Sequence, residues 1–184
     1  MGSVTEPHAR IEPMLGNRYD MQDCSIARAL EVVGERWSLL VIRDAFYGVQ
    51  RFSDFVDHLD IPKAVLSDRL SSLVEAGVLT RSPDPAHAGR ALYSLTPSGR
   101  ELWPVVYSLA QWGSRYARDG SASRRFTHAV CGTELDAHGA CSMCGVTPPP
   151  ADIVATRVTT SAPALRSDRV SIALREPHRL LDPV

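Results

Sequence analysis

The stretch that decides the fold is Ile61-Pro-Lys-Ala-Val-Leu-Ser-Asp-Arg-Leu-Ser-Ser-Leu-Val-Glu-Ala-Gly77, together with the residues that follow it. Its apolar residues recur at the spacing of a helix stripe, Pro62 suits a first helical turn, and Gly77 ends the periodic run. Residues 78–81 and 91–96 then alternate with a period of two, which predicts two strands joined by the proline-rich loop 82–90. The stretch therefore predicts a helix over 62–76 followed directly by a β-hairpin.

Three predicted helices precede this stretch and one follows it. Apolar periodicity predicts helices over 24–33, 37–48 and 52–59, the last with Ser53 as its N-cap. Thr96-Pro97 begins a long helix that runs to about residue 118, and Pro104 should kink or split it. A helix followed at once by a hairpin, after three closely spaced helices, is the order of a winged helix-turn-helix. We therefore expect a mainly α protein with a small β-hairpin.

Two apolar stripes run along the predicted helix over 97–118. The stripe expected to pack on the helical domain consists of Leu102, Val105, Val106, Leu109 and Tyr116. The other consists of Trp103, Tyr107 and Ala110, and one small domain would struggle to cover it. Large uncovered apolar patches usually mark association. The second stripe is therefore either further core or a dimer interface.

The polar side of the 62–76 helix faces outward if its apolar stripe faces the core. Lys63 and Ser67 lie on that side near the N-terminal end, where a recognition helix in the major groove contacts bases or phosphates. His87 and Arg90 at the hairpin tip could reach phosphates or the minor groove beside this helix. The whole chain has 20 basic and 21 acidic residues, a formal charge of −1, and the charges between residues 51 and 100 balance as well. Any nucleic-acid contact must therefore come from local placement.

Five segments keep one register between residues 24 and 118. They are Cys24-Ser-Ile-Ala-Arg-Ala-Leu-Glu-Val-Val-Gly-Glu-Arg-Trp37, Arg51-Phe-Ser-Asp-Phe55, Leu66-Ser-Asp-Arg-Leu70, Glu75-Ala-Gly77 and Tyr93-Ser-Leu-Thr-Pro-Ser-Gly99. Together they resemble the HxlR-type transcriptional regulators, relatives of the MarR group. The resemblance implies a homodimer, formed through the first and last helices of the domain, that binds an operator in double-stranded DNA. It also implies that Arg51 and Arg69 contact or support the DNA backbone, with a salt bridge inside the domain as an equal alternative for Arg69.

Cys24 matches a position at which many members of that family carry a cysteine, and in some of them this cysteine senses oxidants or electrophiles. Ser25 stands where the family usually has proline. The N-terminus of a helix lowers the pKa of a thiol and makes it more nucleophilic. A redox switch at Cys24 and an inert thiol are the two alternatives.

The other three cysteines fall between residues 131 and 144 in two copies of one pattern. The copies are His128-Ala-Val-Cys131-Gly132 and Cys141-Ser-Met-Cys144-Gly145. Each two-residue spacer brings two ligands onto one metal ion, so we expect a ribbon-like module over 126–147 that holds one structural zinc ion per chain. The predicted ligands are His128, Cys131, Cys141 and Cys144. His138 is a competing ligand, and a metal-free cluster or a disulfide is the other alternative.

The rest of the chain carries fewer signals. We expect a flexible arm over 1–23, the winged-helix domain over 24–118 and a tail of unknown role over 148–184. No apolar run approaches the ~20 residues of a membrane span and no signal-peptide layout is present, which predicts a cytoplasmic protein without a membrane partner. No phosphate-binding glycine loop, Gly-x-Ser-x-Gly or His-Glu-x-x-His occurs, so we expect no enzyme activity. A protein- or RNA-interaction module built from the ribbon and tail is the alternative function, and a small-molecule effector is left open.

Overall fold

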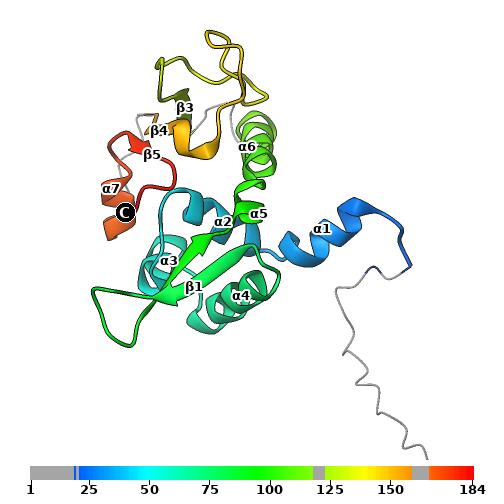
Figure 1. Cartoon of the computed structure of the whole chain (residues 1–184), viewed down its shortest axis with the longest axis vertical. Coiled ribbons are helices and arrows are strands. Elements are labelled where there is room, and N and C mark those ends of the chain that lie inside the picture. Colours follow the sequence, from blue (N-terminus) through cyan, green and yellow to red (C-terminus); the bar gives the residue numbers. More distant parts are fainter. Residues whose placement is uncertain (1–18, 20, 118–122, 159–165) are drawn as a thin grey trace, which may run out of the picture.

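The computed structural model describes residues 19, 21–117, 123–158 and 166–184 of the chain (Figure 1). The arm expected over 1–23 lies almost wholly outside these residues. Among the residues that are described, no helix is both long and apolar enough to cross a membrane.

Four helices form the first part of the fold, namely α1 (Ser25–Val33), α2 (Ser38–Phe46), α3 (Phe52–Leu59) and α4 (Lys63–Glu75). α2 lies at the centre, because Val41, Ile42 and Asp44 point to different sides of it and are all fully buried. Asp60 has the left-handed backbone conformation and turns the chain sharply between α3 and α4. α4 buries its apolar stripe of Leu66, Leu70 and Leu73. The helices predicted over 24–33 and 62–76 are confirmed to within one residue at each end.

The start of α3 differs from the prediction. Arg51 is the N-cap instead of Ser53, and its backbone is extended, with φ −90° and ψ 140°. A β-bridge to Leu92 holds it in that conformation, and the Phe55 N–H donates to its carbonyl oxygen at 3.1 Å. A long-range backbone contact, invisible in local sequence, therefore decides where the helix begins.

The hairpin follows α4 as predicted. β1 (Leu79–Pro83) and β2 (Ala91–Leu95) pair antiparallel, with Leu79 opposite Leu95 and Pro83 opposite Ala91. The Thr96 hydroxyl after β2 accepts a hydrogen bond from the Gly99 N–H at 3.1 Å and caps the next helix.

The long helix expected over 97–118 is divided, as the proline predicted. It consists of α5 (Pro97–Arg100), α6 (Trp103–Trp112) and a π-helical turn η1 (Gly113–Ala117). Pro104 lies in the first turn of α6, where its missing N–H costs no helical hydrogen bond.

The two apolar stripes of this helix have largely exchanged their predicted roles. Trp103 and Tyr107 are only 4% and 2% exposed, because Phe126 packs against both rings with centroid distances of 5.3 and 5.5 Å. Three residues expected to pack on the helical domain are instead exposed, namely Val105, Leu109 and Tyr116. The sequence interpretation missed that the C-terminal part of the chain covers the Trp103 side.

That C-terminal part forms a three-stranded antiparallel sheet in the order β3-β4-β5. Its strands are β3 (Arg124–His128), β4 (Ile153–Arg157) and β5 (His178–Arg179), with a 3-10 turn η2 (Pro150–Asp152) and a helix α7 (Arg169–Ala173) between them. β3, which overlaps the module predicted over 126–147, pairs with β4, in the tail predicted over 148–184.

The last residues of the chain return to the helical core. The Leu181 N–H donates to the Phe46 carbonyl oxygen at 2.8 Å, and the Val184 N–H donates to that of Gly48 at 3.2 Å. Leu174 and Leu180 are buried in the same core cluster. The two parts of the chain thus share one continuous core.

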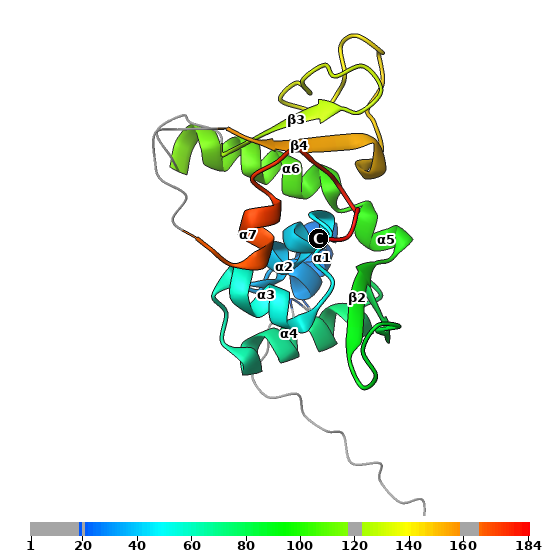
Figure 2. The same cartoon turned by 90° about the vertical axis from the view of Figure 1, so that its left-hand side faces the viewer.

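The elements are arranged so that the two candidate sites lie at opposite ends. Figures 1 and 2 show α4 and the tip of the β1–β2 hairpin at one end, and β3 with the loops after it at the other. α1 projects from the side of the molecule in Figure 1.

Candidate nucleic-acid interface and metal site

The outward face of α4 is free of other parts of the described chain. Lys63 and Ser67 are both exposed on it, while Leu66 between them is completely buried. The helix therefore presents the polar side that the sequence predicts, and its N-terminal turn carries the chain's single lysine.

The hairpin tip beside α4 is organised by a buried carboxylate. Asp84 accepts hydrogen bonds from the Ala86 N–H at 2.8 Å and contacts His87 Nδ1 at 3.2 Å, and its own N–H donates to the Arg90 carbonyl oxygen. The Ala86 N–H is the main cause that lowers the pKa of the Asp84 carboxyl. These contacts fix the loop while the Arg90 side chain stays exposed.

Sequence reasoning missed Asp84, although a signal was available. In Pro83-Asp84-Pro85-Ala86 the carboxylate accepts from the N–H two residues ahead, which is the Asx-turn arrangement typical of aspartate in tight turns.

The two arginines carried over from the family are half-buried and lie close to carboxylates of the same chain. Arg51 Nε is 3.5 Å from Asp84 Oδ2, an ion pair without hydrogen-bond geometry. Arg69 Nη1 is 3.5 Å from Glu35 Oε2 in the α1–α2 turn, and the Arg69 side chain is only 24% exposed. The structure thus brings Arg51 and His87 together at Asp84, and leaves Lys63, Ser67 and Arg90 outward.

Two arginines of the C-terminal segment contact α3 and add positive charge beside it. Arg169 of α7 binds the Asp54 carboxylate at 2.7 Å, and Arg166 donates to the Asp57 carbonyl oxygen. The balance of charge counted between 51 and 100 therefore omits cations that the fold brings to this region from the tail.

The helix-turn-helix of α3 and α4 with the hairpin beside it defines a winged helix-turn-helix protein. The sequence profile of the HxlR-like helix-turn-helix family matches residues 32–121. An HTH-type transcriptional regulator of Mycobacterium tuberculosis (strain ATCC 25618 / H37Rv), Rv3095, is 41% identical over 132 residues, which cover 71% of this chain and 82% of that protein. This chain belongs to the HxlR-like helix-turn-helix family.

Two further similarities agree with this. The HTH-type transcriptional regulator sll1512 of Synechocystis sp. (strain ATCC 27184 / PCC 6803 / Kazusa) is 32% identical over 99 residues, 53% of this chain and 73% of that protein. The crystal structure of PA1607 superimposes with a TM-score of 0.58 at 33% identity and covers 74% of this chain and 94% of that one.

The opposite end of the molecule brings the four predicted metal ligands together. The ligand atoms of His128, Cys131, Cys141 and Cys144 all lie within 4.8 Å of one another. Cys131 Sγ is 3.5 Å from His128 Nδ1 and 3.4 Å from Cys141 Sγ. Tetrahedral zinc bound by sulfur and imidazole nitrogen has ligand–ligand edges of about 3.5 to 3.8 Å, which these two separations approach, and the donor set is one that zinc prefers. The competing ligand, His138, is exposed and lies outside this group.

The two halves of the metal site have the same backbone geometry. The Gly132 N–H donates to the His128 carbonyl oxygen at 2.8 Å, and the Gly145 N–H donates to that of Cys141 at 2.9 Å. Both glycines have the left-handed conformation, with φ of 71° and 67°. The glycine that ends each copy of the sequence pattern is therefore the residue that permits the turn.

Two thiols of this cluster have pKa values that are shifted in opposite directions. Hydrogen bonds from the Thr133 hydroxyl and N–H lower the pKa of Cys131 to about 6, whereas the neighbouring sulfur of Cys131 raises the pKa of Cys144 to about 11. Crowded sulfurs resist simultaneous ionisation, and a divalent cation is the partner that removes this repulsion.

Cys24 lies apart from these cysteines, at the N-cap of α1. Its thiol is exposed, and the N–H groups of Ala27 and Ile26 lower its pKa. The position has the local chemistry of a reactive thiol, as the sequence predicts for a helix N-terminus.

Proposed function

We propose that this protein is a sequence-specific DNA-binding transcriptional regulator that acts as a homodimer. α4 enters the major groove with Lys63 and Ser67, and the hairpin lies on the flanking backbone with Arg90 and His87. Arg51 and Arg69 hold the hairpin and α4 in position instead of binding DNA themselves. The observation that carries the proposal is the exposure of the α4 polar face beside an ordered, exposed hairpin tip at one end of the molecule.

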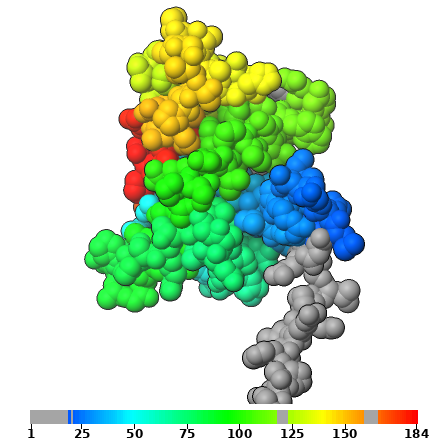
Figure 3. Space-filling model, turned by 45° about the vertical axis from the view of Figure 1, so that its right-hand side comes forward, coloured from blue at the N-terminus to red at the C-terminus, as the bar shows by residue number. Residues whose placement is uncertain are grey.

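Dimerisation is supported by apolar side chains that the described part of the chain leaves uncovered. They belong to α1, α6 and η1, and are Ile26, Leu30, Val105, Leu109, Trp112 and Tyr116. Figure 3 shows α1 and the α6–η1 region on one flank of the molecule. Exposed apolar side chains gathered on one flank of a protein are typical of an association surface. It replaces the Trp103 stripe as the proposed dimer interface.

The test is to recover bound DNA genome-wide and then measure affinity for the enriched site. Six phosphate contacts per dimer predict a loss of about 10³ in affinity between 50 and 200 mM salt. An enriched site with that salt dependence supports DNA recognition. No enriched site, or a flat salt response, would instead favour the interaction-module alternative.

We further propose that His128, Cys131, Cys141 and Cys144 hold one structural zinc ion in a ribbon-like module. The support is the complete set of four protein donors, which leaves no coordination position for a substrate. Metal analysis of purified protein tests it, because the proposal requires close to one equivalent of zinc per chain.

A second candidate function is redox sensing through Cys24, favoured by its exposed thiol and lowered pKa. Mass spectrometry after mild peroxide treatment should find Cys24 oxidised, and Cys24→Ser should remove any effect of peroxide on operator binding. An unmodified Cys24 with unchanged binding would contradict this role.

A further inference from the structure

A cavity of about 620 Å³ lies between the helical domain and the C-terminal sheet. One side of it is apolar and includes Leu40 of α2, Trp103 and Tyr107 of α6, and Phe126 of β3. Its volume falls in the range of about 300 to 1,000 Å³ that is typical of small-molecule sites. β3 and β4 lie beyond or at the end of the segment that the family profile matches, so this wall is built by the C-terminal part of the chain.

The other side of the cavity is cationic and continues into a second cavity of about 190 Å³. Both cavities are lined by His58, Arg124 and Arg157, and the second adds Arg166 and Arg175. Among the described residues that line either cavity, none is an aspartate or a glutamate.

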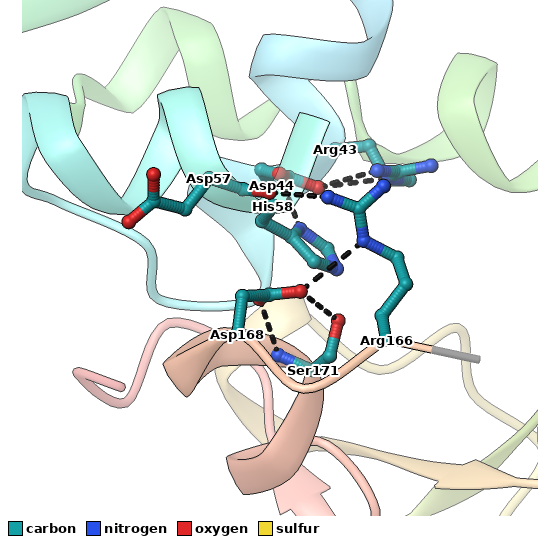
Figure 4. Close-up of polar contacts among 7 residues, drawn as sticks. All are labelled: Arg43, Asp44, Asp57, His58, Arg166, Asp168 and Ser171. Carbon is teal, nitrogen blue, oxygen red and sulfur yellow. Dashed lines mark hydrogen bonds and ion pairs between the residues drawn. The ribbon is translucent and has the colours of Figure 1, made fainter. Parts of the chain in front are cut away.

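Two of the arginines that line these cavities, Arg43 and Arg166, pair with carboxylates that lie behind them. Asp44 is fully buried and binds Arg43 at 2.6 Å as well as His58 Nδ1 at 2.6 Å. Asp168 binds Arg166 at 3.2 Å (Figure 4). These ion pairs lie between α2, α3 and the start of α7, beside the two cavities.

The remaining three cations have no such partner. Within the described residues, no carboxylate lies within 4.0 Å of the guanidinium nitrogens of Arg124, Arg157 or Arg175. Arg124 lies 4.8 Å from the centre of the Tyr47 ring and donates to the Leu174 carbonyl oxygen at 3.2 Å. Burial lowers its pKa first of all, and the nearby Arg43 and Arg157 lower it further. Arg124 and Arg157 are half-buried and repel each other beside an apolar hollow, and this favours a ligand that carries negative charge.

The two cavities together form a seam between the helical domain and the C-terminal sheet. We propose that this seam binds a small aromatic acid, with its ring against Trp103, Tyr107 and Phe126 and its carboxylate on Arg124 and Arg157. Arginine pairs with carboxylates through two parallel hydrogen bonds, and the aromatic side chains supply edge and face contacts to a planar ring. His58 in the last turn of α3 lines both cavities, and the turn after it leads into α4. An effect of such a ligand on operator affinity rests on the function proposed above, whereas binding itself does not.

Calorimetric titration of the zinc-loaded full chain, in its native oligomeric state, tests the site with three probes. 2-Naphthoate is the acid, 2-naphthamide has the same ring without the charge, and inorganic phosphate has charge without the ring. Naphthoate should bind saturably and at least about tenfold more tightly than either of the others. Failure of naphthoate to bind would mean that the hollow is filled by a second copy of the chain or by nothing, and would overturn the proposal. Equal binding of phosphate would overturn the requirement for an aromatic ring.

Variants then locate the site. Arg157→Gln should weaken naphthoate binding at least about tenfold and leave naphthamide binding unchanged. The matched control is Arg125→Gln, because Arg125 neighbours Arg124 on β3 but pairs with Glu134 outside both cavities. If Arg157→Gln does not fold, Arg124→Gln, at the other guanidinium proposed to bind the carboxylate, takes its place. An equal effect of the cavity variant and the Arg125→Gln control would contradict the assignment.

Discussion

At the scale of single residues, the end of the molecule proposed to face DNA carries exposed basic side chains and side chains that are held in ion pairs. Lys63 and Arg90 are exposed, whereas Arg51 and His87 converge on the buried Asp84. The sequence alone could not make this distinction, because it does not show which arginine is exposed and which is held in an ion pair. The Asx turn at Asp84 was the one local signal available.

Lys63→Ala and Arg90→Ala should each weaken operator binding several-fold and reduce the slope of log affinity against log salt by about one, since each removes a phosphate contact. Fluorescence anisotropy over a salt series measures both quantities. Arg125→Ala, in an exposed ion pair at the metal end, is the control and should change neither. If Lys63→Ala leaves both quantities unchanged, α4 is not the recognition helix.

The order of the hairpin tip should depend on pH through Asp84. Its pKa is lowered in the folded state, so the carboxylate stabilises the protein fully above the ordinary value of 3.8, and this contribution is lost as pH falls through the lowered value. The difference in urea midpoint between the wild type and Asp84→Asn should therefore be constant at neutral pH and shrink below about pH 4. Acid also protonates the proposed metal ligands, but this affects the wild type and Asp84→Asn equally and therefore does not change the difference between their urea midpoints. A difference that grows in acid would contradict the assignment.

At the scale of elements, the contact between α2 and the C-terminus makes the fold one unit. Gly48 has φ +80°, and a Cβ atom there would lie 1.7 Å from the Asp182 carbonyl oxygen. A side chain at this position would push the last residues off the core.

Gly48→Ala should accordingly lower the free energy of unfolding by about 2 kcal/mol or more, because backbone strain adds to the steric overlap. Thermal denaturation should register this as a fall of roughly 4 to 8 °C. The control is Gly77→Ala, since Gly77 has a similar φ of +71° but nothing within 4 Å of its Cβ position, and it reports the strain alone. Equal effects of the two variants would show that the tail contact contributes nothing.

Removal of the proposed zinc ion should disorder the loops between β3 and β4, because its four ligands all lie in or beside these loops. We expect chelation with EDTA to expose Tyr107, whose hydroxyl donates to the Asp136 carbonyl oxygen at 2.7 Å, and to lower the melting temperature. Calorimetry with and without added zinc measures the shift. His138→Ala should behave as the wild type, whereas a matched loss in His138→Ala and His128→Ala would contradict the ligand assignment.

At the scale of the whole molecule, the sequence predicts the helical domain well and the C-terminal part poorly. The bounds of α4 could be predicted from its helical periodicity, with Pro62 at its start and Gly77 after its end. The spacing of the ligands was sufficient to predict that His128 lies close to the three cysteines. The tail after residue 148 has weak apolar alternation, and its strand pairs with residues far away in the chain. Because its partners are non-local, no window of sequence could predict that it pairs with β3 or completes the lining of the two cavities.

The oligomeric state also belongs to this scale. Trp112→Glu places a charge on the exposed α6 flank, and we expect it to convert the dimer into a monomer and reduce operator binding by at least about tenfold. Light scattering after size-exclusion chromatography measures the mass. Ile172→Glu, at a side chain exposed to a similar degree on α7, is the control and should remain dimeric. A monomeric wild type would exclude the proposed interface.

The most direct test of DNA recognition by α4 is methylation protection of guanine N7 on the recovered operator. The proposal predicts two protected major-groove segments whose centres are separated by about one helical turn, roughly 10 base pairs, or a multiple of it. It also predicts that the combined Lys63→Ala and Ser67→Ala variant loses this protection while keeping its fold and dimer mass. Absence of N7 protection in the wild type, or unchanged protection in the variant, would contradict it.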